Sequence, residues 1–293
     1  MTLPELTAGG FRVRILADSV CDHHPFRATT IEHRFPRFIL AEINTHRDRC
    51  RSSASSRAIP WDKMRRNIQQ DPFLPLVWGA EQKGMQTGGA IDNPTAADEV
   101  WLRARDLMLG CAQELADLGV HKSLCNRLTE NWMWCTQVMT ATSWKNYFRQ
   151  LCHKDAEVHF RQIATMTQAA LAANTPTVLR EGDWHLPYIL PEERNDPNNS
   201  RLDLAKMSTA RTARVSYMPI DGTAPNREKD MDLFEKLLKG SSFGHWAPLE
   251  APAECVGKDY QGGPLRGWRS LRKHPDYLPL ENADADCAIE LPL

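Results

Sequence analysis

Thr45–Arg57 has the sequence THRDRCRSSASSR, which places one histidine, four arginines and four serines in a single short segment. Directly before it, Pro36–Ile43 has proline where a helix would begin and apolar residues at helical spacing, so a short buried helix is expected to hold the segment in place. Arginine binds phosphate through paired N–H groups, and serine hydroxyls satisfy the remaining oxygens. The segment predicts a site for a phosphorylated small molecule, although a solvated basic loop or a nucleic-acid-binding arm has the same composition.

The composition narrows these alternatives. The chain has 293 residues and a formal net charge of −1, which argues against a general nucleic-acid binder and makes the basic segment a local feature. No apolar run reaches membrane-spanning length, and the first residues lack the apolar core of a signal peptide. The sequence contains eight scattered cysteines and no Cys-x-x-Cys pair: Cys21, Cys50, Cys111, Cys125, Cys135, Cys152, Cys255 and Cys287. We expect reduced thiols in a cytoplasmic protein.

Two segments near the start of the chain have strand patterns. Phe11–Ala17 alternates apolar and polar residues, and Ala28–Phe35 does so more weakly. The residues Cys21–His24 between them have the sequence CDHH and could suggest a metal site. Because no second ligand cluster stands at a standard spacing, we expect a polar turn and no metal.

Helices are expected over 61–70, 95–118 and 229–239. In the second of these, apolar residues repeat in steps of three and four from Val100 to Leu118, and Gly119 suits its end. That helix is expected to be a scaffold whose apolar stripe is buried. The stretch 71–93 between the first two helices is rich in proline and glycine and is expected to be a long loop, and the acidic residues near the C-terminus are expected to form a loosely held tail.

A further helix is expected over 143–173. Polar residues recur along it at positions that share one face: Asn146, Gln150, His153, Glu157 and Arg161. This stripe is either a solvated face or a wall of hydrogen-bonding groups beside a ligand.

Four motifs together resemble the flavin-dependent thymidylate synthases, in particular the longer form found in phages and some bacteria. The first is Thr45-His46-Arg47 through Ser55-Ser56-Arg57, the family's His-Arg signature with its serine-rich end. The others are Gly119–Lys122 with Asn126-Arg127-Leu128, Thr140–Phe148 continuing through Arg161, and Trp184–Pro187. They cover most of residues 11–190.

The later part of the chain matches the family in an unusual order. Ala213–Tyr217 and the Gly244-His245-x-x-Pro248-x-Glu250 segment are similar to flavin-contacting segments that compact family members place before the signature. Here they follow it. We interpret residues 1–293 as a single catalytic domain in which 11–190 bear the signature and 203–273 supply the permuted segments.

The resemblance implies an α+β fold with a central mixed or antiparallel sheet flanked by long helices, similar to the thymidylate-synthase-complementing fold. It also implies a homotetramer with shared active sites, no membrane partner and no nucleic acid. The implied cofactors are FAD, NADPH and methylenetetrahydrofolate, and the implied reaction adds a one-carbon unit to C5 of a deoxypyrimidine monophosphate, by default dUMP to dTMP. The protein positions the reactants and supplies no nucleophile.

The resemblance also assigns residues. FAD would contact His46, Arg47, Asn146, Ser216, His245 and Glu250. The nucleotide would contact Glu42, Ser53, Ser55, Ser56, Arg57 and Arg127, with Arg57 and Arg127 positioning it for the reaction.

Several positions depart from the family pattern. Leu151 replaces an arginine that contacts the nucleotide in many members, and Glu157 and His159 replace a glutamine and a glutamate. Arg49 or Arg51 could compensate for the lost charge. Alternatively, the enzyme 5-hydroxymethylates dUMP or dCMP for modified DNA, since bases are distinguished by hydrogen bonds, or the chain is a non-catalytic relative that binds nucleotide or nucleic acid.

Cys50 stands where the family has serine, among arginines that would lower the pKa of a thiol. No His–Cys arrangement can be derived from the sequence, so we expect a small filling residue and not a nucleophile.

Overall fold

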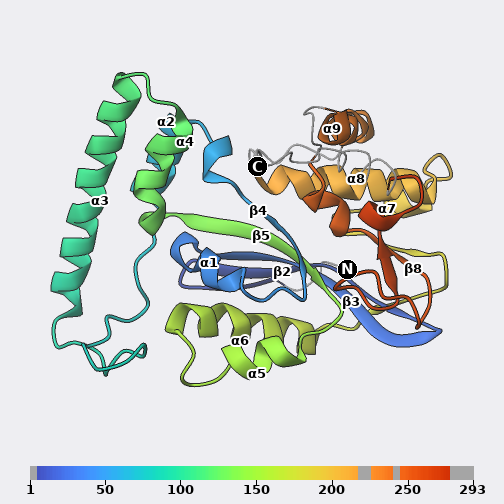
Figure 1. Cartoon of the computed structure of the whole chain (residues 1–293), viewed down its shortest axis with the longest axis horizontal. Helices are drawn as coiled ribbons and strands as arrows, with labels where there is room; N and C mark the ends of the chain where they lie inside the picture. Colours follow the sequence, from blue (N-terminus) through green and yellow to red (C-terminus); the bar gives the residue numbers. More distant parts are fainter. Residues whose placement is uncertain (1–4, 217–225, 240–244, 278–293) are drawn as a thin grey trace, which may run out of the picture.

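The computed structural model describes residues 5–216, 226–239 and 245–277 (Figure 1). The expected tail, Tyr217 and Gly244 lie outside these residues, as does the side chain of Ser216. Helices and antiparallel strands are both present, which confirms the α+β class. Within the described ranges, no helix is both long and apolar enough to cross a membrane.

A six-stranded sheet forms the centre of the molecule. Its strands are β1 (Glu5–Ala8), β2 (Phe11–Cys21), β3 (His24–Pro36), β4 (Cys50–Ser53), β5 (Trp134–Ala141) and β6 (Thr177–Leu179). The order is β1-β2-β3-β5-β4, and the short β6 pairs in parallel with the end of β2. The two strands expected from alternation are confirmed as parts of β2 and β3, which form a long antiparallel hairpin.

The two faces of this sheet have different roles. Phe11, Val13 and Ile15 of β2 are buried in the largest apolar cluster, together with residues of α5 (Lys145–Leu151) and α6 (Val158–Ala173). These two helices lie under the sheet in Figure 1. Arg12 and Arg14 alternate with the apolar residues, so they face the other side.

The single helix expected over 143–173 is wrong. The chain leaves the helix at Cys152 and starts α6 at Val158. Glu157 caps the new helix, because its carboxylate accepts hydrogen bonds from the backbone N–H groups of His159 and Phe160, each at 2.9 Å. The expected polar stripe therefore does not lie on one continuous helix.

The scaffold helix is confirmed as α3 (Pro94–Asp117), which packs with α2 (Trp61–Gln70) and α4 (Lys122–Cys125) at one end of the molecule (Figure 1). Gly119 ends it with φ of +83°, as expected. The expectation that its apolar stripe is buried is wrong in part: Leu107 and Leu118 are 65% and 80% exposed. The helix is rotated so that Leu109 and Ala112 face the core instead.

A second unit lies beside the central sheet. It contains the three-stranded sheet β7 (Trp184–His185), β8 (Ala253–Cys255) and β9 (Trp268–Ser270), with α7 (Pro191–Asn195), α8 (Arg201–Ala213) and α9 (Arg227–Lys239). A disulfide joins Cys21, at the end of β2, to Cys255, at the end of β8. The expectation that all cysteines are reduced is therefore wrong at this pair. The organisation of the chain as one catalytic domain stays a prediction.

Candidate functional site

The basic segment that opened the sequence analysis is only partly a loop. Residues 45–49 follow α1 (Leu40–Ile43), then β4 adds to the edge of the sheet, and the 3-10 turn η2 (Ser56–Ala58) ends the segment. In the register with β5, Cys50 lies opposite Thr140 and Ser53 opposite Gln137. The Arg51 guanidinium donates to the backbone oxygens of Asn44 at 2.6 Å and His46 at 3.2 Å, so one arginine of the segment folds the loop back onto the strand.

Two of the residues assigned to FAD, His46 and Asn146, lie beside Tyr147 of α5. The His46 ring stands edge-on to the Tyr147 ring, with 5.4 Å between centroids, and Asn146 is the exposed neighbour of that tyrosine. Arg47 is exposed on the loop. Burial, followed by the charges of Arg49 and Arg51, lowers the pKa of His46. His46 is thus favoured as a neutral ring at the sheet edge.

Arg49 is a buried cation beneath this loop. Only 6% of it is exposed, and its guanidinium lies 4.4 Å from the centroid of Tyr147 and 5.1 Å from that of Trp144. Burial lowers its pKa, and its Nε has no hydrogen-bond partner among the described residues. The buried Tyr147 hydroxyl also lacks one in that part of the chain. Two unsatisfied donors therefore lie side by side behind His46.

Glu250 lies against the beginning of β4, although the two are far apart in sequence. It belongs to the 3-10 turn η5 (Ala247–Glu250), and its carboxylate pairs with Arg272 at 2.7 Å. The Cys50 thiol also hydrogen-bonds to Glu250, and burial together with that carboxylate raises the pKa of Cys50 well above its usual value. The fold thus brings Glu250 to the basic segment, and it keeps Cys50 a protonated thiol.

The remaining residues assigned to FAD are less informative. His245 is exposed three residues before Pro248. Among the described residues, no hydrogen bond joins its side chain to Glu250 or Cys50. Its backbone N–H donates to Leu237 at the end of α9. Ser216 ends the 3-10 turn η4 (Arg214–Ser216).

The serines assigned to the nucleotide are in different situations. Ser53 accepts a hydrogen bond of 2.7 Å from Gln137, whereas Ser55 is half-buried. Ser56 is 3% exposed and donates to Glu130 at 2.7 Å, so its hydroxyl is committed to holding the fold. Glu42 is exposed on α1.

Arg57 and Arg127 are brought together by the turns that hold them. Arg127 belongs to η3 (Asn126–Trp132), and the Asn126 amide donates to the backbone oxygens of Ser56 at 2.6 Å and Ile59 at 2.9 Å. Both arginines are exposed, and neither guanidinium has a hydrogen bond or ion pair with any residue in the described ranges. Two exposed cations without described partners therefore stand on turns that Asn126 joins.

The positions that depart from the family pattern are part of the fold. Leu151 is 7% exposed and belongs to the main apolar cluster. Glu157 caps α6, and the His159 ring is buried, with its Nε2 accepting a 3.0 Å bond from the backbone of Leu76. These three side chains stabilise the start of α6 and its contact with the long loop.

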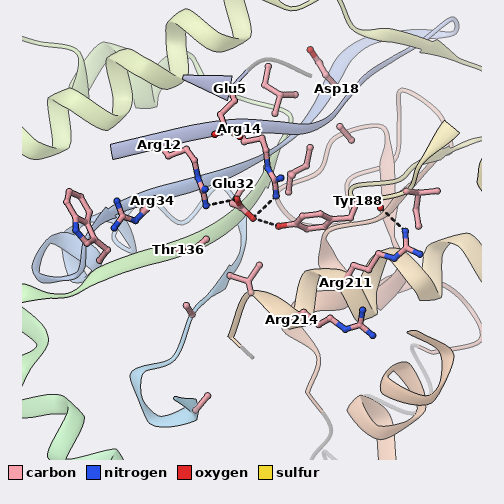
Figure 2. A pocket seen from close by; sticks show the side chains of 18 of the residues that line it. Glu5, Arg12, Arg14, Asp18, Glu32, Arg34, Thr136, Tyr188, Arg211 and Arg214 are labelled. Atoms are coloured by element: carbon pink, nitrogen blue, oxygen red, sulfur yellow. Dashed lines mark hydrogen bonds and ion pairs between the residues drawn. The ribbon is translucent and has the colours of Figure 1, made fainter. Parts of the chain in front are cut away.

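The sequence analysis missed a cavity of about 1860 Å³ on the other face of the sheet (Figure 2). Glu32 lies at its centre and accepts hydrogen bonds from Arg12 at 3.3 Å, Arg14 at 3.2 Å and the Tyr188 hydroxyl at 2.6 Å. Tyr188 is held at φ of +62°, and burial followed by the Glu32 charge raises its pKa well above the usual value. None of the residues assigned to FAD or nucleotide whose side chains the structure describes lines this cavity. Only the alternation of Arg12 and Arg14 within β2 indicated a second polar face.

Comparison with known proteins finds similar solved structures. No family model and no curated protein matches the sequence. Two solved structures of the UMP/dUMP methylase PolB from Streptomyces cacaoi are similar. The complex with 5-Br UMP is 15% identical, covers 55% of this chain and 88% of its own, and has a TM-score of 0.47. The complex with 5-Br dUMP is 16% identical, covers 52% and 69%, and has a TM-score of 0.41.

Proposed function

We propose that the protein is an enzyme that adds a one-carbon unit to C5 of a deoxypyrimidine monophosphate, by default converting dUMP to dTMP. The observation that supports this most is the pair Arg57 and Arg127, exposed and without described partners on two turns clamped by Asn126. Such a pair can bind a phosphate monoester bidentately from two directions. Ser55 and Ser53 lie in the same segment and can position the rest of the nucleotide.

The residues near His46 fit a flavin. Buried donors without partners are rare in native proteins, and Arg49 Nε and the Tyr147 hydroxyl are two of them at one place. A cofactor rich in acceptor atoms would satisfy donors of this kind. His46, Arg47 and Asn146 would hold it from the loop and α5, and Glu250 and Arg272 would hold it at the beginning of β4. When bound, a flavin reduced by NADPH would provide hydride chemistry at this place, and methylenetetrahydrofolate would be the source of the carbon.

The protein's own part in the reaction is binding and electrostatics. Arg57 and Arg127 fix the phosphate, and the positive charge of Arg49 and Arg51 stabilises anionic groups beside the loop. Cys50 serves as a filling residue, because burial and Glu250 keep its thiol protonated.

We further propose that the enzyme works as a homotetramer in the cytoplasm. In a shared site, one subunit supplies the anion-binding turns and another supplies flavin contacts. The exposed apolar residues of α3, in particular Leu107 and Leu118, support burial of this helix against a second copy.

Leu151, Glu157 and His159 depart from the family pattern and are the basis of two alternatives to methylation. One is 5-hydroxymethylation of dUMP or dCMP, and the other is a non-catalytic relative that binds nucleotide or nucleic acid. Their buried and capping roles account for them without a change of chemistry. No described contact favours either alternative over methylation.

Binding measurements test the anion site. Arg57→Ala and Arg127→Ala should each weaken dUMP binding about 10- to 100-fold, as expected for loss of a charged hydrogen bond. Arg103→Ala, which removes an exposed arginine from α3, is the matched control and should leave binding unchanged. Unchanged dUMP affinity in both site variants, by calorimetry, contradicts the proposed site.

Mass spectrometry of the products tests the reaction. The protein is incubated with FAD, NADPH and methylenetetrahydrofolate, with dUMP and dCMP offered separately. Formation of dTMP supports the proposal, and a 5-hydroxymethyl product supports the first alternative. Both nucleotides returned unchanged by a protein that binds FAD would favour the non-catalytic relative.

A further inference from the structure

A cluster of potential metal ligands lies where the central sheet meets the second unit. Cys21 ends β2, His24 begins β3 after a two-residue turn, and Cys255 ends β8. All three side chains are buried, with 6%, 6% and 0% of their surface exposed. The sequence analysis set aside the Cys-x-x-His pair for want of a further ligand, and the fold supplies one from the other end of the chain.

The geometry of the cluster matches a zinc site. Zinc binds thiolate at about 2.3 Å and imidazole at about 2.0 Å with tetrahedral angles, which sets ligand atoms roughly 3.5 Å apart. His24 Nε2 lies 3.6 Å from Cys255 Sγ, and the possible ligand atoms of all three residues lie within 4.8 Å of one another. The two cysteine Cα atoms are 6.4 Å apart, toward the wide end of the range for a disulfide, so the sulfurs can separate with little movement of the backbone.

The backbone at Gly267 leaves room for the imidazole ring of His24. Gly267 has φ of +75°, and a Cβ atom at this position would lie 2.7 Å from His24 Nε2. The Gly267 carbonyl accepts the Nε2 hydrogen bond at 3.0 Å, and the Trp268 ring stands edge-on to the imidazole. His24 Nε2 is therefore held within 3.6 Å of Cys255 Sγ. Ligation through Nε2 moves the ring proton to Nδ1, and it replaces both the bond to the Gly267 carbonyl and the bond that Nδ1 accepts from the Phe26 N–H.

We propose that Cys21, His24 and Cys255 bind a zinc ion in the reduced protein, and that the disulfide is the oxidised, metal-free form of the same site. Two thiolates and one imidazole are a ligand set that suits zinc. The fourth position is open to water or to Asp22, whose Oδ1 lies 3.8 Å from Cys21 Sγ. The inference is independent of the proposed function.

The two forms interconvert by a balanced reaction. A dithiol reductant gives up two electrons and two protons and becomes a disulfide. The Cys21–Cys255 bond breaks, and each sulfur takes one of the protons. Zinc then displaces both protons and binds the two thiolates and Nε2 of His24. Either form ties the tip of the β2–β3 hairpin to β8, so the junction is held in reducing and in oxidising surroundings.

Metal analysis tests the proposal on the full chain. Protein reduced with a phosphine, supplied with zinc and then desalted should contain about one zinc per chain. Oxidation with diamide should release the zinc while peptide mapping detects the Cys21–Cys255 cross-link. A folded, reduced protein with far less than one zinc per chain would overturn the proposal, and so would zinc retained after the cross-link has formed.

Variants locate the ion. His24→Gln keeps a side chain that can donate to Gly267, and it should weaken zinc binding more than 100-fold, because even loss of an outer-shell partner costs about 10- to 100-fold. His23→Gln, at the exposed neighbouring position, is the matched control. Cobalt bound to the wild type should show stronger thiolate-to-metal charge transfer than cobalt bound to Cys255→Ser, which keeps only the Cys21 thiolate. Equal zinc affinity in the two histidine variants would place any bound ion elsewhere.

Discussion

Cys50 and Cys111 show how strongly surroundings decide the behaviour of the same side chain. Cys50 is buried at the edge of the sheet, where Glu250 accepts its thiol hydrogen and the carboxylate charge raises its pKa. Cys111 lies exposed on α3. Cys50 has arginine neighbours in the sequence, but in the fold its pKa is raised by burial and by the carboxylate of Glu250, which is distant in the sequence.

Alkylation of the native protein should follow this difference. Iodoacetamide at pH 8 should leave Cys50 and Cys135 of the native protein intact, because burial raises the pKa of Cys135 to about 11 and that of Cys50 well above normal. Cys111 should react to the extent that this face of α3 is free of a subunit contact. Peptide mass spectrometry over time gives the rates, with urea-unfolded protein as the control in which all three react. Rapid modification of native Cys50 would restore it as a candidate nucleophile.

Two buried histidines should make stability depend on pH. Burial lowers the pKa of His33 and of His185 from 6.5 to about 3, with Arg49 adding to the effect at His33 and Arg194 at His185. Between these values the unfolded chain binds more protons than the folded one, so the free energy of unfolding falls as pH falls from 6.5 toward 3. The slope is at most about 1.4 kcal/mol per pH unit for each histidine.

Urea unfolding at pH 7.0 and 5.5 measures this slope. His185→Asn, which removes one of the two groups, should reduce the change in stability to about half of the wild-type value if the two contribute equally. Stability that is flat across this interval, or that rises as pH falls, contradicts the assignment of neutral buried rings.

At the scale of the element, the break between α5 and α6 shows where periodicity fails. Polar residues continue at helical spacing through 152–157, so the pattern predicts one helix. The fold instead uses Glu157 as a cap, and the Arg161 guanidinium donates to the backbone oxygen of Lys154 to close the connection. A side chain that caps a new helix can break a helix even where helical spacing continues. The spacing of apolar residues does not show which of the two structures forms.

Glu157→Ala should destabilise the protein by about 0.5–2 kcal/mol through loss of the cap. The carboxylate receives two backbone N–H groups and also contacts the His159 ring, so the upper part of this range is expected. Glu114→Ala, at an exposed position within α3, is the control and should change stability by less than about 0.5 kcal/mol. Equal effects in urea unfolding would show that the cap contributes nothing.

Elements with a strong local signal were predictable. Alternation located β2 and β3, and apolar spacing with Gly119 located α3. The face that α3 buries was not predictable, because Leu107 and Ala112 lie on neighbouring stripes of nearly equal apolar character and only the packed neighbours decide between them. Likewise β4 is short and polar, and only its pairing with β5 makes it a strand.

For the whole molecule, the sequence predicted the α+β class and the residues of the basic segment, and the resemblance placed Glu250 near it. Glu250 does approach Cys50, whereas a role of the late segments in binding a flavin stays a prediction. The Cys21–Cys255 pair and the Glu32 cavity were not predicted, because contacts between distant segments leave no local pattern in a single chain.

The exposed stripe on α3 leads to a prediction about assembly. Leu107→Glu should shift the protein to smaller species in sedimentation velocity, because a charge in an apolar contact between subunits is costly to desolvate. Thr95→Glu, which adds the same charge at an exposed polar position of the helix, should not. An unchanged distribution for Leu107→Glu would mean that α3 stays outside any subunit contact.

The disulfide between Cys21 and Cys255 closes residues 21–255 into a covalent ring. When the chain is pulled from both sides of this ring, the force passes through the disulfide. The elements between Cys21 and Cys255 therefore carry no load. Opening the link frees 234 positions of contour, roughly 800 Å at about 3.4 Å each. When no zinc is bound, the redox state of this pair therefore decides whether residues 21–255 can be extended under tension.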